Sequence, residues 1–443
     1  MTHLQALETK IKSRQAIIGV IGLGYVGLPV ACAFAQAGFS VIGIDIKAER
    51  AVAINAGSNP IEGEEPGLAE LLAEVIQAGR LRATSDYAEL AGADVVLIDV
   101  ETPVDDDHRP RYAALRAACR SLGAVIKPGA LIVVESTIAP GTIERVVRPL
   151  LEEASGRRAN VDFYLGACPE RVMPGKLLAN LRTLSRVCGG STPETAQVMV
   201  SLYRTIVQAE LDAADPITAE LVKTTENAYR DVQIAFANEV ALICEAAGGD
   251  VWRVRELVNK SPFRAMHLPG AGVGGHCIPK DPWLLAHGAA GQAPLRLIPA
   301  ARAVNDGMPL HVAELSVAAL ANAGVEPGKA RVAVLGYAYL EDSDDTRNSP
   351  SQALEAELRR LGVELRIHDP WVAPYQGDVL ECIQGCDAVV VMVAHSAYKT
   401  LSLAALKAAL RTPILIDGRR AFDAAQARAL GFAYYGVGVG VRR

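Results

Sequence analysis

Apolar runs and helical patterns of hydrophobic and polar positions alternate from the start of the chain. Residues 16–21 form a β-rich apolar run, a helical pattern continues to about Ala37, and a second apolar run covers residues 40–46. This order predicts a strand, a helix and a second strand, the unit from which parallel sheets are built. Further elements are expected at residues 93–100, 112–122, 130–135 and 162–166. We therefore expect an α/β domain with a doubly wound sheet over residues 1–205.

A long helical pattern then replaces the alternation. It runs from Asp215 to Ala247, with Pro216 in its first turn and two glycines directly after its end, which are favourable start and stop signals. Helical patterns continue around a glycine-rich loop as far as about residue 323. The sequence predicts a central helical region at residues 206–325. We expect this region to offer the interface of a homodimer or a larger homo-oligomer.

Alternation returns in the last part of the chain. Apolar or alternating runs predict strands at residues 331–336, 364–368, 387–393 and 413–417. The first helix of this block has Ser349 as its N-cap, Pro350 at its first position and Gln352 at its third, all favoured there. The pattern predicts a second α/β domain at residues 326–443.

Composition excludes several classes of protein. The chain has 443 residues, half of them hydrophobic, so it is too long for one ordinary core and is expected to be globular. A formal net charge of -6 argues against a nucleic-acid surface, although 44 Lys and Arg residues suffice for a phosphate pocket. The eight cysteines lack the dense spacing of a disulfide framework, and Cys382 with Cys386 lacks a second pair for zinc. We expect no metal site and a reducing, cytoplasmic location.

One segment has the composition of a membrane span. Residues 16–35 are uncharged and largely apolar. Four glycines and Pro29 inside the segment would weaken a spanning helix, whereas a buried strand, a tight turn and a helix start explain each of them. We therefore expect no membrane association.

Three glycines follow the first predicted strand. Gly22, Gly24 and Gly27 form Gly-x-Gly-x-x-Gly between a strand and a helix, and Asp45 ends the next strand. In this context the glycines permit the turn, the approach of a pyrophosphate and close helix packing, while the acid binds the ribose hydroxyls. The motif predicts an N-terminal Rossmann domain that binds NAD, because Asp45 would repel the 2'-phosphate of NADP. Residues 337–346 lack such a triplet, so the Rossmann-like C-terminal domain is expected to bind another ligand.

A glycine-rich loop carries a candidate nucleophile. Residues 274–282 place Cys277 after two glycines and before two prolines, with Asp281 four residues further on. Glycines let the backbone approach a ligand closely, and prolines restrict the chain. A free cysteine is most often a small buried hydrophobe, which is the expected role of the other seven. As a nucleophile, Cys277 would need a base and an oxyanion site from elsewhere in the chain.

A second candidate segment follows a predicted strand. Residues 136–142 lie where ligands gather in doubly wound sheets, so Thr137 could bind a substrate or an ordered water. Alternatively, Ser136 or Thr142 could simply cap the next helix. The local pattern favours neither role.

Further polar candidates lie on and near the long helix. Glu220, Lys223 and Asn227 are three and four residues apart and share one helix face. Such faces are usually solvated, but a lysine and an asparagine in a cleft could stabilise a developing oxyanion. Glu170, just after a predicted strand, is a candidate general base, and its alternative role is an ion pair in a loop.

Taken together, these motifs resemble the UDP-glucose/GDP-mannose dehydrogenase family. The matching segments are residues 22–29, 136–142, 169–171, Lys223 with Asn227, 270–282 and 345–350. The resemblance covers nearly the whole chain, and its six motifs occur in the family's order. It implies a four-electron oxidation of the carbon 6 alcohol of a nucleotide sugar to a carboxylate, with two NAD used in succession. The intermediates would be a thiohemiacetal and a thioester on Cys277.

The resemblance also implies which residues form the sites. The catalytic residues would be Cys277, Lys223, Asn227, Asp281, Glu170 and Thr137. The NAD site would consist of Gly22, Gly24, Tyr25, Val26, Gly27, Asp45, Thr102 and Thr137. The UDP-sugar site would consist of Glu170, Arg171, Lys223, Asn227, Gly274, Gly275, Arg347 and Arg419.

The resemblance also implies a role for each catalytic group. Lys223 and Asn227 would stabilise the oxyanion. Asp281 and Thr137 would hold the water that shuttles protons. Glu170 would activate the hydrolytic water. Without the resemblance, the two arginines Arg347 and Arg419 would be interpreted as surface charges on turns.

Details of the motifs bear on the substrate. Residues 169–174 and 269–282 resemble the branch that acts on UDP-N-acetylhexosamines, so we rank UDP-N-acetyl-D-mannosamine first, the glucosamine second and the galactosamine third. Leu340 departs from the family, where many members have lysine, and Glu101 stands where proline is common. The alternatives are a UDP-glucose 6-dehydrogenase, a single-step β-hydroxyacid dehydrogenase and a non-catalytic protein that binds NAD and UDP-sugars.

Overall fold

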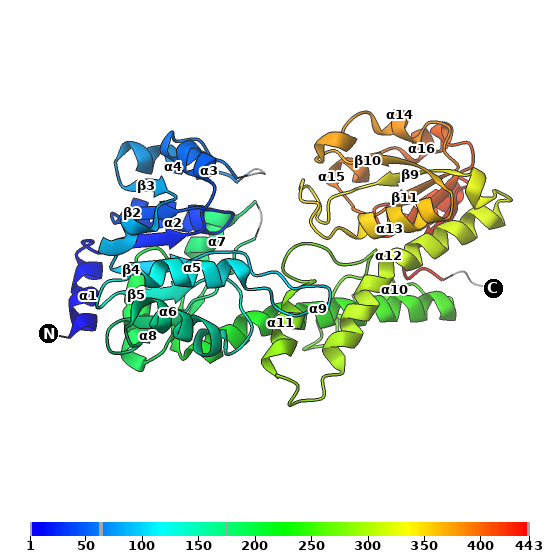
Figure 1. Ribbon diagram of the computed structural model, residues 1–443. Coiled ribbons are helices and arrows are strands. Elements are labelled where there is room, and N and C mark those ends of the chain that lie inside the picture. Colours follow the sequence, from blue (N-terminus) through cyan, green and yellow to red (C-terminus); the bar gives the residue numbers. More distant parts are fainter. Residues whose placement is uncertain (1, 62–64, 174, 441–443) are drawn as a thin grey trace. The chain divides into compact units, whose positions relative to one another are not determined.

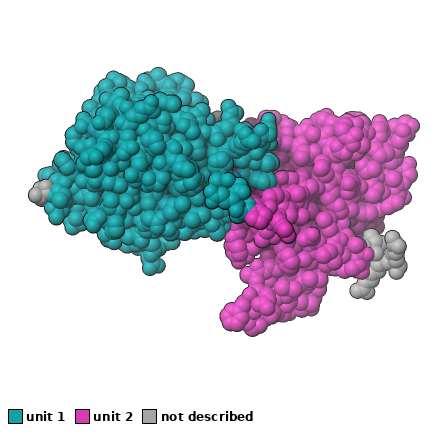
Figure 2. Space-filling model, turned by 60° about the horizontal axis from the view of Figure 1, so that its bottom comes forward, with its two compact units in different colours: residues 1–226, 283–293 teal, residues 227–282, 294–443 magenta. Residues whose placement is uncertain are grey.

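The computed structural model describes residues 2–61, 65–173 and 175–440. The chain divides into two compact units, shown in Figure 2. Unit 1 consists of residues 1–226 and 283–293, and unit 2 of residues 227–282 and 294–443. Each unit is built around one β-sheet (Figure 1).

The sheet of unit 1 has eight strands in the order β3-β2-β1-β4-β5-β6-β7-β8. Their bounds are β1 Ile17–Ile21, β2 Ser40–Ile44, β3 Leu81–Thr84, β4 Val95–Ile98, β5 Leu131–Val134, β6 Tyr164–Ala167, β7 Arg186–Gly190 and β8 Leu211–Ala214. Neighbouring strands are parallel except β6 and β7, which are antiparallel. The strand order reverses between β1 and β4, and ligands bind at such points in doubly wound sheets.

Helices cover both faces of this sheet. They are α1 His3–Lys12, α2 Gly27–Gln36, α3 Ala48–Asn55, α4 Leu68–Gln77, η1 Tyr87–Gly92, α5 Ala113–Gly123, η2 Ile143–Val147, α6 Arg148–Ser155, α7 Leu177–Thr183 and α8 Pro193–Tyr203. Val20 and Leu97 belong to the apolar core on one face, whereas Ile21 and Ile98 belong to the core on the other. Successive strand residues point to opposite faces, so strands buried on both faces are apolar throughout.

Unit 2 contains a parallel five-stranded sheet in the order β10-β9-β11-β12-β13. Its strands are β9 Arg331–Leu335, β10 Glu364–His368, β11 Ala388–Val391, β12 Ile414–Asp417 and β13 Ala433–Gly436. Its helices are α10 Val251–Val258, α12 Leu297–Asn322, η3 Pro327–Lys329, α13 Pro350–Arg360, η4 Ala373–Tyr375, α14 Val379–Ile383, α15 Ser396–Lys399, α16 Leu403–Ala409 and α17 Ala424–Ala429. Two helices have residues in both units, α9 Pro216–Ala247 and α11 Asp281–Gly288.

The predicted α/β architecture is confirmed. The apolar stretch of residues 16–35 contains β1, a turn and most of α2, and no helix of the described residues is long and apolar enough to cross a membrane. The long helix begins at Pro216, as its sequence signals indicated. Ser349 caps α13, but its hydroxyl accepts from the amide of Ser351, and the Gln352 side chain donates to a carbonyl outside the helix instead of closing a capping box.

Several short strands were not predicted. The strands β3, β7, β8 and β13 have four or five residues and mix apolar with polar or small side chains. Such runs carry little periodicity, so pairing with neighbouring strands decides their structure. The eighth strand, β8, extends the first sheet past residue 205.

Candidate active site

The turn between β1 and α2 needs two of its three glycines for its own packing. Gly22 has a φ of +94°, and a Cβ there would lie 2.4 Å from the carbonyl oxygen of Asp99. A Cβ on Gly27 would lie 1.9 Å from the carbonyl oxygen of Gly22. A Cβ on Gly24 would meet no atom within 4 Å. The second glycine therefore faces open space at the start of α2, where a pyrophosphate could approach the helix amides.

Asp45 lies at the end of β2 and holds this turn. One oxygen of its buried carboxylate accepts from the amide of Leu23 at 3.1 Å and from the Arg50 guanidinium at 2.9 Å. The other oxygen accepts from the amide of Lys47 at 2.9 Å. Val26 is the N-cap of α2, and the Tyr25 hydroxyl donates to Glu65. Together with the glycines, this acid fits the adenosine end of NAD.

Two predicted cofactor residues meet where β4 and β5 end. The Thr102 hydroxyl donates to the carbonyl of Thr137 at 2.6 Å, and the Ser136 hydroxyl donates to the carbonyl of Val100 at 2.6 Å. The hydroxyl of Thr142 donates to the carbonyl of Ala139, and makes no cap hydrogen bond. The alternative role of these hydroxyls as helix caps is therefore not seen.

Glu220 of α9 binds the backbone at the end of the segment of residues 136–142. Its buried carboxylate accepts hydrogen bonds from the backbone amides of Gly141 and Ile143, the latter at 2.8 Å. Burial raises the pKa of Glu220 to about 7, against the effect of these two hydrogen bonds. Lys223 is half-buried one turn further along the helix. The shared helix face thus begins with a structural acid, a role that spacing alone did not indicate.

Glu170 lies in a buried cluster of charges. One of its carboxylate oxygens accepts from the amide of Arg171 at 2.6 Å, and the other from the guanidinium of Arg186. The guanidinium of Arg171 in turn pairs with Glu226 and donates to the carbonyl of Ser185. Glu170 thus forms an ion pair in this structure, which was the alternative that the sequence left open. Its role as a base stays a prediction.

The cysteine loop in unit 2 brings two predicted catalytic residues together. The Asn227 side chain donates to the carboxylate of Asp281 at 2.5 Å, and the Lys280 ammonium donates to its other oxygen at 2.7 Å. Asp281 is fully buried, and its amide donates to the carbonyl of Cys277 at 2.9 Å. The thiol-bearing residue itself is exposed. The sequence did not single out Lys280, and its place beside Asp281 was the available signal.

The charge beside the thiol comes from an arginine and not from the neighbouring histidine. Burial, with the positive charges of Lys280 and Arg347, lowers the pKa of His276 to about 4. The imidazole is therefore neutral at pH 7. Hydrogen bonding to Asp345 raises the pKa of Arg347, and the charge of Cys277 contributes in the same direction. Arg347, which pairs with Asp345 at 2.6 Å, is thus the cation whose charge interacts with Cys277.

The two glycines before the cysteine let this loop pack against the segment after β9. A Cβ on Gly274 would lie 2.6 Å from the Cβ of Tyr339, and Gly275 has a φ of +91°. The amide of Gly275 donates to the carbonyl of Arg347 at 2.8 Å. Arg419 donates to the carbonyl of Gly272 at 2.9 Å, and burial lowers the pKa of its guanidinium to about 10. Arg419 is therefore not the surface charge of the alternative interpretation.

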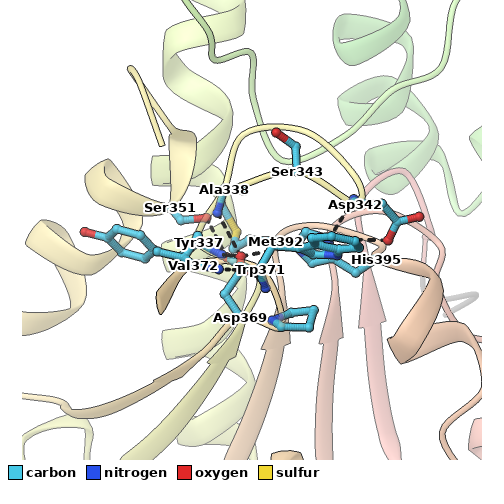
Figure 3. Close-up of polar contacts among 12 residues, drawn as sticks. Tyr337, Ala338, Asp342, Ser343, Ser351, Asp369, Trp371, Val372, Met392 and His395 are labelled. Atoms are coloured by element: carbon cyan, nitrogen blue, oxygen red, sulfur yellow. Dashed lines mark hydrogen bonds and ion pairs between the residues drawn. The ribbon is translucent and has the colours of Figure 1, made fainter. Parts of the chain in front are cut away.

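Asp369, at the end of β10, takes the place in the second sheet that Asp45 takes in the first. Figure 3 shows the amides of Tyr337, Ala338 and Val372 around its carboxylate, with distances of 2.6, 2.9 and 3.1 Å. The carboxylate also contacts the Nε2 atom of His395 at 3.1 Å. Although burial raises it, these hydrogen bonds lower the pKa of Asp369 to about 2. Four backbone amides and this imidazole contact the two oxygens of Asp369, against three donors at Asp45, so Asp369 has less capacity left for a ribose.

Comparison with known proteins agrees with a nucleotide site in the first sheet and a different site in the second. The models of the UDP-glucose/GDP-mannose dehydrogenase family match in three parts: the NAD binding domain at residues 16–207, the central domain at 217–307 and the UDP binding domain at 333–424. The chain belongs to the UDP-glucose/GDP-mannose dehydrogenase family. It is an NAD-dependent nucleotide-sugar dehydrogenase, an oxidoreductase, as the sequence resemblance implied.

Relatives cover nearly all of the chain. It is 40% identical over 423 residues to a UDP-N-acetyl-D-mannosamine dehydrogenase of Pyrococcus horikoshii, a match that spans 96% of this chain and 99% of the relative. The solved structure of a UDP-D-ManNAc dehydrogenase from that organism has a TM-score of 0.90 at 39% identity, over 95% of this chain and 99% of the other. An NDP-N-acetyl-D-galactosaminuronic acid dehydrogenase from Methanosarcina mazei has a TM-score of 0.88 at 38% identity, over 99% and 98%.

Proposed function

We propose that this dehydrogenase oxidises the carbon 6 alcohol of UDP-N-acetyl-D-mannosamine to the carboxylate, removing four electrons. The observation that carries the proposal is the exposed Cys277, close in the chain to the buried ion pair of Lys280 and Asp281, to which the half-buried Asn227 donates a hydrogen bond. The other seven cysteines are buried or half-buried. The sugar is proposed from the name of the Pyrococcus horikoshii relative.

The proposed chemistry runs through the sulfur of Cys277. NAD, when bound, accepts a hydride in each of the two oxidations. The first oxidation leaves an aldehyde, to which the thiolate adds to form a thiohemiacetal; the second leaves a thioester. Water then cleaves the thioester, releases the carboxylate and restores the thiol. The positive charge of Arg347 interacts with Cys277 and would favour the thiolate that adds to the aldehyde.

The remaining roles follow the family resemblance. Lys223 and Asn227 stabilise the oxygen that becomes negatively charged, and one good donor is worth about 3 kcal/mol. Asp281 fixes the orientation of the Asn227 amide through its 2.5 Å hydrogen bond. Thr137 helps Asp281 to hold the proton-shuttling water, and Glu170 directs the hydrolytic water.

The ligand sites are divided among three domains in this proposal. The NAD site lies in residues 1–205, the catalytic cysteine in residues 206–325, and the residues that bind the UDP group in residues 326–443. Gly274, Gly275, Arg171, Arg347 and Arg419 complete the sugar-nucleotide site. The seven other thiols are buried or half-buried, and the chain lacks the dense cysteine spacing of a disulfide framework, which supports a reducing compartment, the cytoplasm.

We infer that a homodimer forms along α9. Tyr229, Phe236 and Ile243 are 63%, 59% and 59% exposed and are seven residues apart, so they lie on one face of the helix. An exposed apolar stripe of this kind favours helix pairing. Light scattering on the wild type and on Phe236→Glu tests the inference: a dimer that the charge converts to a monomer supports it, and an unchanged mass contradicts it.

Counting NADH tests the proposed reaction. Purified protein is mixed with NAD and a limiting amount of the UDP derivative of N-acetylmannosamine, N-acetylglucosamine, N-acetylgalactosamine or glucose. We expect two NADH per sugar, and the highest kcat/KM with the mannosamine. The Methanosarcina mazei structure makes the galactosamine the main competitor. One NADH per sugar would indicate a single-step dehydrogenase, and sugar binding without NADH a non-catalytic protein.

A further inference from the structure

Four charged residues meet at one edge of the first sheet. Asp99, Glu135 and Glu170 lie just beyond the carboxyl ends of β4, β5 and β6. Arg186 is the first residue of β7, which runs antiparallel to β6. Because of that reversed direction, the start of β7 lies at the edge where the parallel strands end. The cluster therefore results from the one antiparallel pair of the sheet.

The guanidinium of Arg186 is shared between two carboxylates. Its Nη2 donates to Glu170 and its Nη1 donates to Glu135 at 3.2 Å. The hydroxyl of Tyr203, on α8, donates to the same oxygen of Glu135 at 2.6 Å. The side chains of Arg186 and Glu135 are 1% and 0% exposed. Water therefore cannot replace either partner of the guanidinium.

Asp99 makes no hydrogen bond with Arg186 and lies beside Glu135 instead. Its two carboxylate oxygens are buried and accept no hydrogen bond from any residue that the structure describes. Burial raises the pKa of Asp99 well above its usual value, and the charge of Glu135 adds to this effect. Glu135 and Glu170 are therefore the two carboxylates that share the guanidinium of Arg186.

The cluster has few other titratable groups. The charged and titratable residues that face it are Asp99, Glu135, Cys168, Glu170, Arg186, Cys188 and Tyr203. Burial raises the pKa of Cys168 and of Tyr203, so both are neutral. The charge balance at Glu170 thus depends on Arg186 and Glu135.

We propose that Arg186 is a positioning residue that orients the carboxylate of Glu170, and that Glu135 limits this effect by competing for the same guanidinium. The inference rests on the proposed function, in which Glu170 directs the hydrolytic water. Arg186 touches neither substrate nor cofactor in this proposal. It acts through Glu170 on the step that releases the product.

The pH dependence of kcat tests the proposal, because two variants should move its acidic limb in opposite directions. Removing the cation in Arg186→Met should lower kcat about 100-fold, with KM within threefold, and should move the acidic limb of the kcat profile up by about one pH unit. Removing the competitor in Glu135→Gln should move that limb down. Arg186→Lys, which keeps the charge, should recover part of the loss. Arg82→Met, an exposed arginine paired with Glu89 in the same unit, is the matched control.

Intact-protein mass spectrometry under turnover identifies the step affected. Arg186→Met should accumulate the acyl group on Cys277, because thioester hydrolysis is slowed while both oxidations continue. The proposal is overturned if the acidic limb of the kcat profile does not move in Arg186→Met. It is also overturned if the limb moves in the same direction in Arg186→Met and in Glu135→Gln. An equal loss of NAD affinity and of kcat, which would indicate a purely structural arginine, overturns it as well.

A cycle of unfolding measurements needs no substrate. Urea unfolding is measured for the wild type, Arg186→Met, Glu170→Gln and the double variant. If Arg186 holds Glu170, its loss costs less stability when Glu170 is already changed. Equal costs in the two backgrounds overturn the proposal. If the stability costs of the two changes are coupled but the wild-type protein yields no NADH, the contact between Arg186 and Glu170 stands and the proposed function is wrong.

Discussion

The side-chain amide of Asn227 donates a 2.5 Å hydrogen bond to the carboxylate of Asp281. The two residues come from α9 and from the start of α11, directly after the loop that carries Cys277, and are 54 positions apart in the sequence. Because the carboxylate also holds the ammonium of Lys280, the direction of the Asn227 amide is fixed from the catalytic loop. Moving the loop would therefore move the amide that is proposed to stabilise the oxyanion.

Asp281→Asn should lower both activity and stability. The change leaves the largely buried ammonium of Lys280 without its counter-ion, which costs about 3 kcal/mol, and frees the Asn227 amide, which should lower kcat about 100-fold. Urea unfolding and steady-state kinetics measure the two effects. The double variant Asp281→Asn with Lys280→Met should recover most of the stability but not the kcat. If the double variant recovered both its stability and its kcat, Asp281 would have no role in the reaction beyond its ion pair with Lys280.

Cys277→Ser should bind NAD normally and fail to turn over. A serine hydroxyl is not ionised at neutral pH and is a much weaker nucleophile than a thiolate, so it should not replace Cys277 in adding to the aldehyde. We expect at most one NADH per active site, followed by no steady-state rate, in a stopped-flow experiment. Cys382→Ser, at a half-buried thiol in α14, is the control and should keep full activity. A fully active Cys277→Ser would contradict the covalent mechanism.

The pattern of the sequence predicted the fold well where strands are buried on both faces. Residues 130–134 are apolar without interruption, and the structure places strand β5 within the predicted segment 130–135. The hydrophobic pattern could not show whether a strand runs parallel or antiparallel to its neighbours. Nothing in the run from Arg186 to Gly190 indicates an antiparallel strand, yet that direction brings Arg186 to Glu170.

Local spacing also predicted the candidate site only in part. Cys277 and Asp281 are four residues apart, so one loop places both. Glu220 shares a helix face with Lys223, and that spacing could not reveal that Glu220 binds amides 77 and 79 residues away. Contacts of this length depend on tertiary packing, which a single sequence does not encode in its periodicity. Asp369 could have been found, since it ends the second strand of its domain as Asp45 does.

The stability of the protein should fall between pH 4.5 and 7 because of Glu220. Its pKa is raised to about 7 in the folded chain from the usual 4.5. Above pH 4.5 the unfolded chain loses this proton while the folded chain keeps it, so up to about 3 kcal/mol of stability is lost as the pH rises to 7. Glu220→Gln cannot titrate and should flatten this part of a plot of urea-unfolding free energy against pH. Glu239→Gln, at an exposed position of α9, should leave the plot unchanged. Parallel plots for Glu220→Gln and the wild type would show that Glu220 titrates normally.

Two alanine variants should separate the folding of the nucleotide turn from its binding of NAD. A Cβ on Gly24 meets no protein atom within 4 Å, so Gly24→Ala should unfold at nearly the wild-type temperature. The same methyl group would occupy the space that the pyrophosphate approaches, so NAD affinity should fall at least about tenfold in calorimetry. A Cβ on Gly27 would lie 1.9 Å from the carbonyl oxygen of Gly22, so Gly27→Ala should lower the melting temperature as well. If Gly24→Ala bound NAD as tightly as the wild type, the pyrophosphate could not lie over this glycine.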